Sequence, residues 1–151
     1  MKPTPSGWPR FSSAVVYKDA AAAIDWLCEA FGFEVKLKVE GENGRIEHCE
    51  LTYGDGLIML AQENPSSERD WRRSLRSPLS LNGANTQNLM FYVDDAEAHC
   101  AEARARGARI VEELAVHDYG DDYWSDRSYG ALDPEGHLWW ITQRLRSPAA
   151  A

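Results

Sequence analysis

The sequence predicts an α+β fold in which one βαβββ module occurs twice in tandem. Residues 13–35 and 88–110 resemble each other at an offset of 75 positions. Each stretch opens on an apolar run, passes an Asp, continues for about three helical turns and stops at a Gly, as a strand, a capped helix and a C-cap do in succession. Three strand-like segments follow each helix. The aligned pairs are Tyr17 with Tyr92, Asp19 with Asp94 and Gly32 with Gly107.

In the first module, the predicted helix carries one apolar stripe with the spacing i, i+3, i+4 and i+7, which suits packing on a sheet. This stripe consists of Ile24, Leu27, Cys28 and Phe31. Alternating and β-branched residues between turn signals predict the strands that follow. We expect these strands at about residues 34–39, 46–52 and 57–61, with turns at residues 41–44 and 54–56.

The second module has a weaker helical stripe, which leaves two registers open. The offset of 75 places His99 opposite Ile24, whereas a slip of one residue places Cys100 there. We expect its three later strands at about residues 109–114, 127–132 and 137–142, with Asp133 to Gly136 as the last turn.

The length of 151 residues is typical of one domain with a single core. We expect module 1 at about residues 12–62, module 2 at about 87–143 and a C-terminal tail at 144–151. A linker at about 63–86 is rich in Asn, Pro, Ser and Arg. A linker of this length usually has a function or some secondary structure, so we expect one or two helical turns around residues 67–75.

The overall charge argues against two classes of partner. Lys and Arg number 16 and Asp and Glu number 24, which gives 16 − 24 = −8. Such an acidic surface repels nucleic acid and anionic membranes. No apolar run is long enough to span a membrane, and the three cysteines form no disulfide or zinc pattern. We therefore expect a cytoplasmic protein with buried thiols.

Four phrases resemble the vicinal oxygen chelate superfamily, which contains glyoxalases, bleomycin-resistance proteins and ring-cleaving dioxygenases. They are "AIDWLCEAFGFEV", "HCELTYGDGLIML", "VDDAEAHCAEARARGARIV" and "YGALDPEGHLWWITQ". The resemblance covers about residues 12–143 and implies that each module curls its sheet into a cup, so that two cups form a paired half-barrel. It also implies a small-molecule ligand, and a homodimer, because drug-binding members commonly build their pockets across a subunit contact.

The resemblance also identifies where a divalent metal is often held, by His, Gln or Glu near the start of the first strand and on the fourth strand of each module. In this sequence those positions correspond to Ser12 or Ser13, Met59 or Leu60, Asn88 beside Gln87, and Trp140. Met is a soft ligand, Ser and Asn are weak ones and Trp is none, so we expect neither a metal nor another cofactor.

His48 and Glu50 are the candidate catalytic residues. They lie two apart on a predicted strand and so share a face, where they could act as an acid/base pair. The alternative is a pair on the solvent face of the sheet.

The candidate ligand-binding residues belong to two groups. Met59, Asn88, Phe91 and an inward-facing Trp140 would form a mostly apolar, aromatic pocket. Tyr123, Trp124 and Arg127, in the acidic stretch 117–129, could line or cover that pocket. Equally, Arg127 could neutralise neighbouring Asp residues while the aromatic side chains pack at a dimer contact.

The favoured interpretation is a bleomycin-resistance-type protein that binds or sequesters a small aromatic or peptide-like compound without a metal, as in antibiotic resistance. The alternative is a glyoxalase-like lyase or isomerase, or a dioxygenase, with an atypical metal site or with His48 and Glu50 as acid and base. An interaction module that keeps the fold without a ligand is a third possibility.

Overall fold

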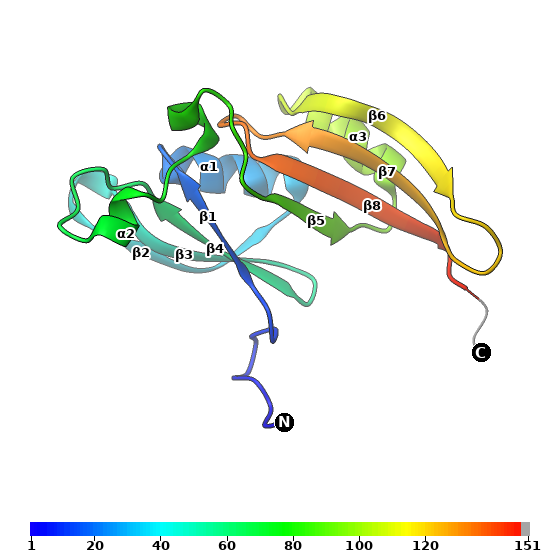
Figure 1. The fold of residues 1–151 in the computed structure, drawn as a ribbon, viewed down its shortest axis with the longest axis horizontal. Coiled ribbons are helices and arrows are strands. Elements are labelled where there is room, and N and C mark those ends of the chain that lie inside the picture. The colour runs from blue at the N-terminus through cyan, green and yellow to red at the C-terminus, as the bar shows by residue number, and fades with distance from the viewer. Residues whose placement is uncertain (149–151) are drawn as a thin grey trace. The chain divides into compact units, whose positions relative to one another are not determined.

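The computed structural model describes residues 1–148 and divides into two compact units at Ala84 and Asn85. Each unit contains a four-stranded mixed sheet and one longer helix (Figure 1). The boundary falls at the end of the linker expected at 63–86. Among the described residues, no helix combines the length and apolar character that a membrane span requires.

The first unit has the predicted order of strand, helix and three strands. Its sheet has the order β1-β4-β3-β2, in which β1 and β4 are parallel and the other neighbours antiparallel. The linker adds the short helix α2 and a 3-10 turn at Pro78–Leu81. The elements are β1 (Ser13–Tyr17), α1 (Ala20–Trp26) continued by a π-helical turn (Leu27–Phe31), β2 (Glu34–Glu40), β3 (Ile46–Tyr53), β4 (Gly56–Gln62) and α2 (Asp70–Arg73).

The second unit repeats this topology with the strand order β5-β8-β7-β6. Strand β6 runs four residues beyond its expected end because residues 115–118 pair with residues 125–128 of β7. Strand β8 likewise includes residues 144–146, which were expected in the tail, while residues 149–151 of that tail lie outside the described part of the chain. The elements are β5 (Asn88–Tyr92), α3 (Ala96–Ala105), β6 (Arg109–Asp118), β7 (Ser125–Leu132) and β8 (Leu138–Arg146).

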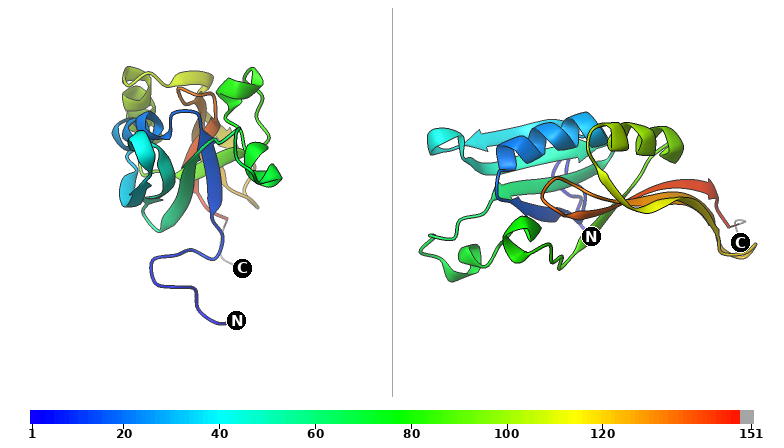
Figure 2. Two further views of the ribbon diagram at one scale, coloured as in Figure 1. Left: turned by 90° about the vertical axis from the view of Figure 1, so that its left-hand side faces the viewer. Right: turned by 90° about the horizontal axis from the view of Figure 1, so that it is seen from above.

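Each sheet buries one face beneath its own helix (Figure 2). In the first unit, the side chains under α1 alternate along the strands, as the period of two in a strand requires. They include Val15, Cys49, Leu51 and Leu60, all almost completely buried. In the second unit, Tyr129, Trp139 and Ile141 have the same role under α3. We call the opposite face of each sheet, which its helix does not cover, the open face.

The π-helical turn explains why two registers fitted the second helix. Ala96, Cys100 and Ala103 are buried where the first unit buries Ala20, Ile24 and Leu27, which is an offset of 76 and not 75. At the end of the second unit's helix, the Ala108 N–H donates to the Ala103 carbonyl, five residues earlier. At the corresponding point of the first unit, the Phe33 N–H donates to the Leu27 carbonyl, six residues earlier. One extra residue in the first unit therefore restores the offset of 75 at Gly32 and Gly107.

The same correction changes the expected strand and cap pairs. Tyr17 is buried and corresponds to the buried Val93, whereas Tyr92 lies on the open face. Asp19 caps α1 and corresponds to Asp95, which caps α3 by accepting the N–H groups of Glu97 and Ala98 at 3.0 Å. The aligned pairs Tyr17–Tyr92 and Asp19–Asp94 are thus wrong by one residue.

The cap can be tested with two adjacent aspartates. Asp95→Ala is expected to lower the free energy of unfolding by about 1 kcal/mol because two N–H groups of the first turn lose their acceptor. Asp94→Ala, the control at the position that the ungapped alignment favoured, is expected to change it by less than about 0.5 kcal/mol. Urea denaturation of both variants measures the difference, and equal losses would show that Asp95 is not the cap.

Candidate functional site

His48 and Glu50 share the open face of the first sheet, as the sequence predicted. His48 Nε2 lies 3.3 Å from Glu50 Oε1. Glu50 Oε2 lies 3.2 Å from Lys36 Nζ, and the Glu50 side chain is only 9% exposed. Lys36 is the extra residue of a β-bulge in β2, since Val35 pairs with Leu51 and Leu37 with Glu50. The bulge turns the lysine side chain toward the carboxylate.

This arrangement keeps the Glu50 carboxyl group ionised. Burial raises its pKa, but the hydrogen bonds to His48 and Lys36 and their positive charges outweigh burial and hold the pKa below its ordinary value. A carboxylate held in this way can orient the His48 ring through the contact at Nε2. The His48–Glu50 pair thus presents an oriented imidazole ring, which could exchange a proton with a bound molecule.

The open face of the second sheet is dominated by large side chains around Trp140. Strand pairing places Met90, Trp140 and Gly130 side by side in one row. A Cβ atom on Gly130 would lie 3.1 Å from the Trp140 ring, so the indole crosses the glycine backbone closely. A side chain at this position would therefore require the indole to move by a few tenths of an ångström. Trp139, the neighbour of Trp140, is buried under α3, as the predicted opposite orientation of the two tryptophans requires.

Arg144 extends this aromatic face. Its guanidinium carbon lies 5.4 Å from the ring centroids of both Tyr92 and Trp124. Its Nη2 donates to the Tyr92 hydroxyl at 2.7 Å, and its Nε donates to Asp126 Oδ1 at 2.5 Å. The hydrogen bond to Asp126 raises the pKa of the guanidinium. Arg144 thus holds two aromatic rings in a fixed arrangement.

Sequence reasoning missed Met90, Tyr92 and Arg144 in this group. The available signal was the period of two along a strand. Met90 and Tyr92 lie on the same face of β5 as Asn88, and Arg144 lies on the same face of β8 as Trp140. This signal was overlooked for Arg144 because β8 was expected to end at residue 142.

Two predicted ligand-binding residues lie on the other face of the second sheet. Phe91 packs beneath α3, with its ring 5.6 Å from His99 and 6.2 Å from Trp139. Arg127 lies on the same face as the buried Tyr129, and its Nη1 is 3.7 Å from Glu97 Oε2 on α3. Phe91 and Arg127 therefore do not share the face of Trp140, because both alternate in the opposite phase along their strands. Their role in ligand binding stays a prediction.

The other predicted residues reach an open face or its edge. Asn88 is exposed on β5, and Met59 lies on the open face of the first sheet opposite Glu50. Tyr123 and Trp124 lie in the β6–β7 connection with ring centroids 6.1 Å apart, and Tyr119 lies 5.6 Å from Trp124. Asp126 pairs with Arg144 and not with Arg127.

Comparison with known proteins agrees with this architecture. Residues 11–141 match the model of the Glyoxalase/Bleomycin resistance protein/Dioxygenase superfamily. The chain belongs to this superfamily. An uncharacterized protein of Mycobacterium bovis is 31% identical over 138 residues, which span 91% of this chain and 85% of the relative. A counterpart in Mycobacterium tuberculosis has the same identity, with 76% of its length covered.

Several solved structures share the fold. TioX from Micromonospora sp. ML1 has a TM-score of 0.66 and 28% identity, with 91% of this chain and 100% of TioX covered. A glyoxalase/bleomycin resistance protein/dioxygenase family enzyme from Burkholderia phytofirmans PsJN has a TM-score of 0.66 and 19% identity, with 89% and 97% covered. The predicted α+β fold with two βαβββ modules is therefore confirmed.

The superfamily's metal positions carry side chains that do not fit a divalent ion. Ser12 donates its hydroxyl hydrogen to the Leu57 carbonyl at 2.6 Å, and Asn88 is its counterpart at the offset of 76. Met59 and Trp140 are equivalent in the sheets, because they pair with Ala14 and Met90. A hydroxyl, an amide, a thioether and an indole make a poor donor set for Zn, Ni, Fe or Mn. Within residues 1–148, no group of three His, Cys, Asp or Glu side chains is placed to hold a metal.

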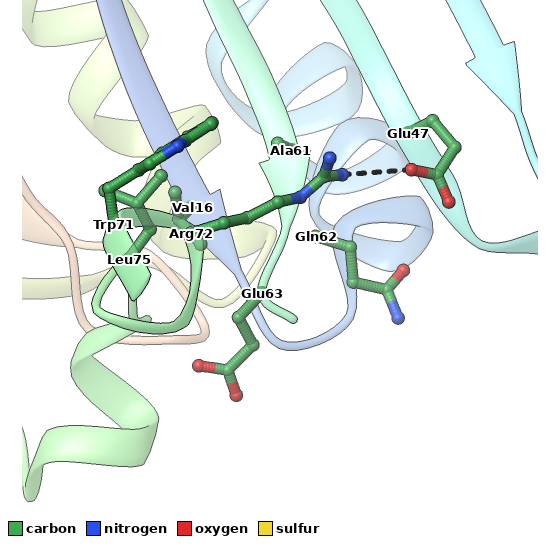
Figure 3. Close-up of a pocket in the computed structure, with 8 residues that line it drawn as sticks. All are labelled: Val16, Glu47, Ala61, Gln62, Glu63, Trp71, Arg72 and Leu75. Carbon is green, nitrogen blue, oxygen red and sulfur yellow. Dashed lines mark hydrogen bonds and ion pairs between the residues drawn. The ribbon is translucent and has the colours of Figure 1, made fainter. Parts of the chain in front are cut away.

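The first unit also contains a half-open cavity of about 190 Å³ beneath the linker (Figure 3). Val16 and Ala61 contribute its floor from the open face, and α2 with the residues after it contributes a wall. The predicted helical turns around 67–75 are thus present in part, but the sequence did not indicate the cavity. Its lining comprises Val16, Glu47, Ala61, Gln62, Glu63, Trp71, Arg72 and Leu75.

Proposed function

We propose that this superfamily member binds a small aromatic or peptide-like compound, without a metal, on the open face of the second sheet. The observation that carries the proposal is the exposure of the large side chains that lie beside Trp140 and Arg144 on this face. Met90 is 53% exposed, Tyr92 47% and Trp124 38%. Soluble proteins rarely leave such a patch uncovered unless it contacts a ligand or partner.

The composition of this face suits stacking better than catalysis. Indole and phenol rings contribute a large contact area with few rotatable bonds, and their polar groups orient a ligand. Arg144 adds a fixed cation that could bind a carbonyl or carboxylate of a peptide-like compound. We infer that the protein sequesters its ligand, as a resistance protein in the cytoplasm would.

We also propose that the protein is a homodimer. A second copy would cover part of the exposed aromatic surface, including Tyr119 and Tyr123, and superfamily members that bind drugs commonly place the pocket at a subunit contact. Sedimentation equilibrium measures the mass directly. A monomer at all concentrations would contradict the proposal.

Ligand binding can be measured by calorimetric titration of the purified protein with bleomycin and other aromatic peptide antibiotics. For any compound that binds, Trp140→Ala is expected to weaken the affinity about thirtyfold, since an aromatic anchor at the centre of a contact contributes about 2 kcal/mol. Phe11→Ala, which removes an exposed ring from the first unit, is the control and should leave the affinity unchanged. An unchanged affinity in Trp140→Ala would place the ligand elsewhere.

The His48–Glu50 pair supports a second candidate function, a glyoxalase-like lyase or isomerase. The 3.3 Å contact orients an imidazole on an open face, as acid/base catalysis requires. Turnover of an α-hydroxy or α-keto substrate that is lost in His48→Ala would favour the enzyme over the binding protein. Equal turnover by the natural protein and by His48→Ala would exclude His48 as the catalytic group.

A further inference from the structure

The cavity beneath the linker is separate in sequence and chemistry from the aromatic face of the second sheet. It lies wholly within the first unit, between the open face at Val16 and Ala61 and the linker residues Trp71 and Leu75. Its apolar lining consists of the aliphatic side chains of Val16, Ala61 and Leu75 together with the indole of Trp71. Figure 3 shows the Arg72 side chain stretching from α2 to Glu47 across this space.

The charged groups around the cavity are already paired with one another. Arg72 Nη2 donates to Glu47 Oε2 at 3.0 Å, and Arg45 Nε lies 3.1 Å from Glu47 Oε1. Glu47 is the extra residue of a second β-bulge, since Val39 pairs with His48 and Glu40 with Ile46. The bulge interrupts the regular alternation of side chains along β3, so that the Glu47 carboxylate points toward α2.

The second carboxylate of the lining, Glu63, is occupied by the linker. Its Oε2 accepts from Arg76 Nε at 2.9 Å and from the Ser77 N–H at 3.2 Å, and its Oε1 accepts from Ser80 Oγ at 2.6 Å. A charged ligand would lose hydration against the apolar lining and find no uncompensated charge in return. The site therefore favours a neutral occupant.

The size of the cavity suits a single ring. An apolar cavity of about 150 Å³ is large enough to bind benzene, and this one measures about 190 Å³. Trp71 lines it while remaining 59% exposed, so its ring offers a face for stacking next to the opening.

We propose that this linker pocket is a second binding site, which takes a small neutral molecule with one aromatic ring, stacked on Trp71 and seated on Val16 and Ala61. The site does not rest on the function proposed for the second sheet, because every residue that forms it belongs to the first unit. The two proposals can therefore fail separately.

The test uses three molecules that share a ring and differ in charge: benzyl alcohol, benzoate and benzylammonium. Each is titrated into the full-length ¹⁵N-labelled protein, and amide and indole NMR shifts are followed. Benzyl alcohol is expected to give saturable shifts centred on Val16, Ala61 and the Trp71 indole. The two ions should bind at least tenfold more weakly. Shifts centred elsewhere, or equal binding by an ion, would overturn the proposal.

Two variants and one control locate the site. Ala61→Leu fills the floor and should abolish the shifts, and Trp71→Ala should weaken binding about tenfold by removing the stacking face. Ala14→Leu makes the same change at an exposed open-face position outside the cavity and should bind benzyl alcohol normally. The NMR spectrum itself shows whether each variant is folded. Normal binding by Ala61→Leu would refute the pocket.

Discussion

Replacing Asp133 by alanine is expected to lower the free energy of unfolding by about 3 to 5 kcal/mol, because three buried donors lose their acceptor together. Asp133 is almost fully buried at the turn before β8. Its Oδ1 accepts the N–H groups of Glu135 and His137 at 3.1 Å each, and its Oδ2 accepts Trp139 Nε1 at 3.0 Å. One carboxylate thus holds both the turn and the largest core side chain.

Urea denaturation followed by circular dichroism measures this loss. Asp133→Asn keeps one acceptor oxygen but presents an amide N–H₂ group to one of the donors, so an intermediate loss of about 1 to 3 kcal/mol is expected. Asp55→Ala, in the exposed turn between β3 and β4, is the control and should change the free energy by less than about 0.5 kcal/mol. A loss below about 1 kcal/mol in Asp133→Ala would mean that water replaces the carboxylate.

The turn at Asp133 was predictable because its chemistry is local. Asp, Pro and Gly in close succession identify a turn from sequence alone, and the structure closes it by bonds from Asp133 N–H to the His137 carbonyl and from Gly136 N–H to the Asp133 carbonyl. The order of the elements was predictable for the same reason, since alternation, cap residues and glycines mark each strand and helix.

The π-helical turn was not predictable, because its extra residue leaves no mark in composition. Leu27 to Phe31 have the same apolar spacing that an ordinary helical turn would have, and only the hydrogen bond from Phe33 to Leu27 shows the additional residue. The ungapped alignment therefore matched the glycines correctly and shifted the first strand and helix by one.

The residues of the candidate site were predictable only where the alternation of side chains along a strand decides which face they share. The period of two in a strand predicted that His48 and Glu50 share a face and that Trp139 and Trp140 face opposite sides, and the structure has both arrangements. Lys36 and Glu47 were missed because β-bulges re-aim their side chains, and a bulge depends on pairing between strands. Trp71 and Arg72 were missed as pocket residues because only the folded linker brings them over Val16 and Ala61.

The linker depends on Glu63, whose replacement by alanine is expected to lower the free energy of unfolding by about 2 to 4 kcal/mol. The Glu63 carboxylate is only 6% exposed and paired with Arg76. Its removal leaves that guanidinium and the buried Ser77 N–H without their acceptor. Because the linker is also the wall of the cavity, Glu63→Ala should loosen Trp71 as well, which faster hydrogen exchange in residues 70–81 would reveal.

The charge of Glu63 gives this stabilisation a defined pH dependence. Burial raises its pKa, but the hydrogen bonds from Ser80, Arg76 and Ser77 and the charge of Arg76 bring the net pKa below the ordinary 4.5. A pKa that is lower in the folded state contributes stability above the unfolded value, and this contribution disappears as the pH falls through the folded value. The stability difference between the natural protein and Glu63→Gln should therefore be constant near neutrality and shrink below about pH 4.5. Glu68→Gln, an exposed change in the same linker, supplies the control, and a difference that stays constant down to pH 3 would show that the ionised carboxylate does not anchor the linker.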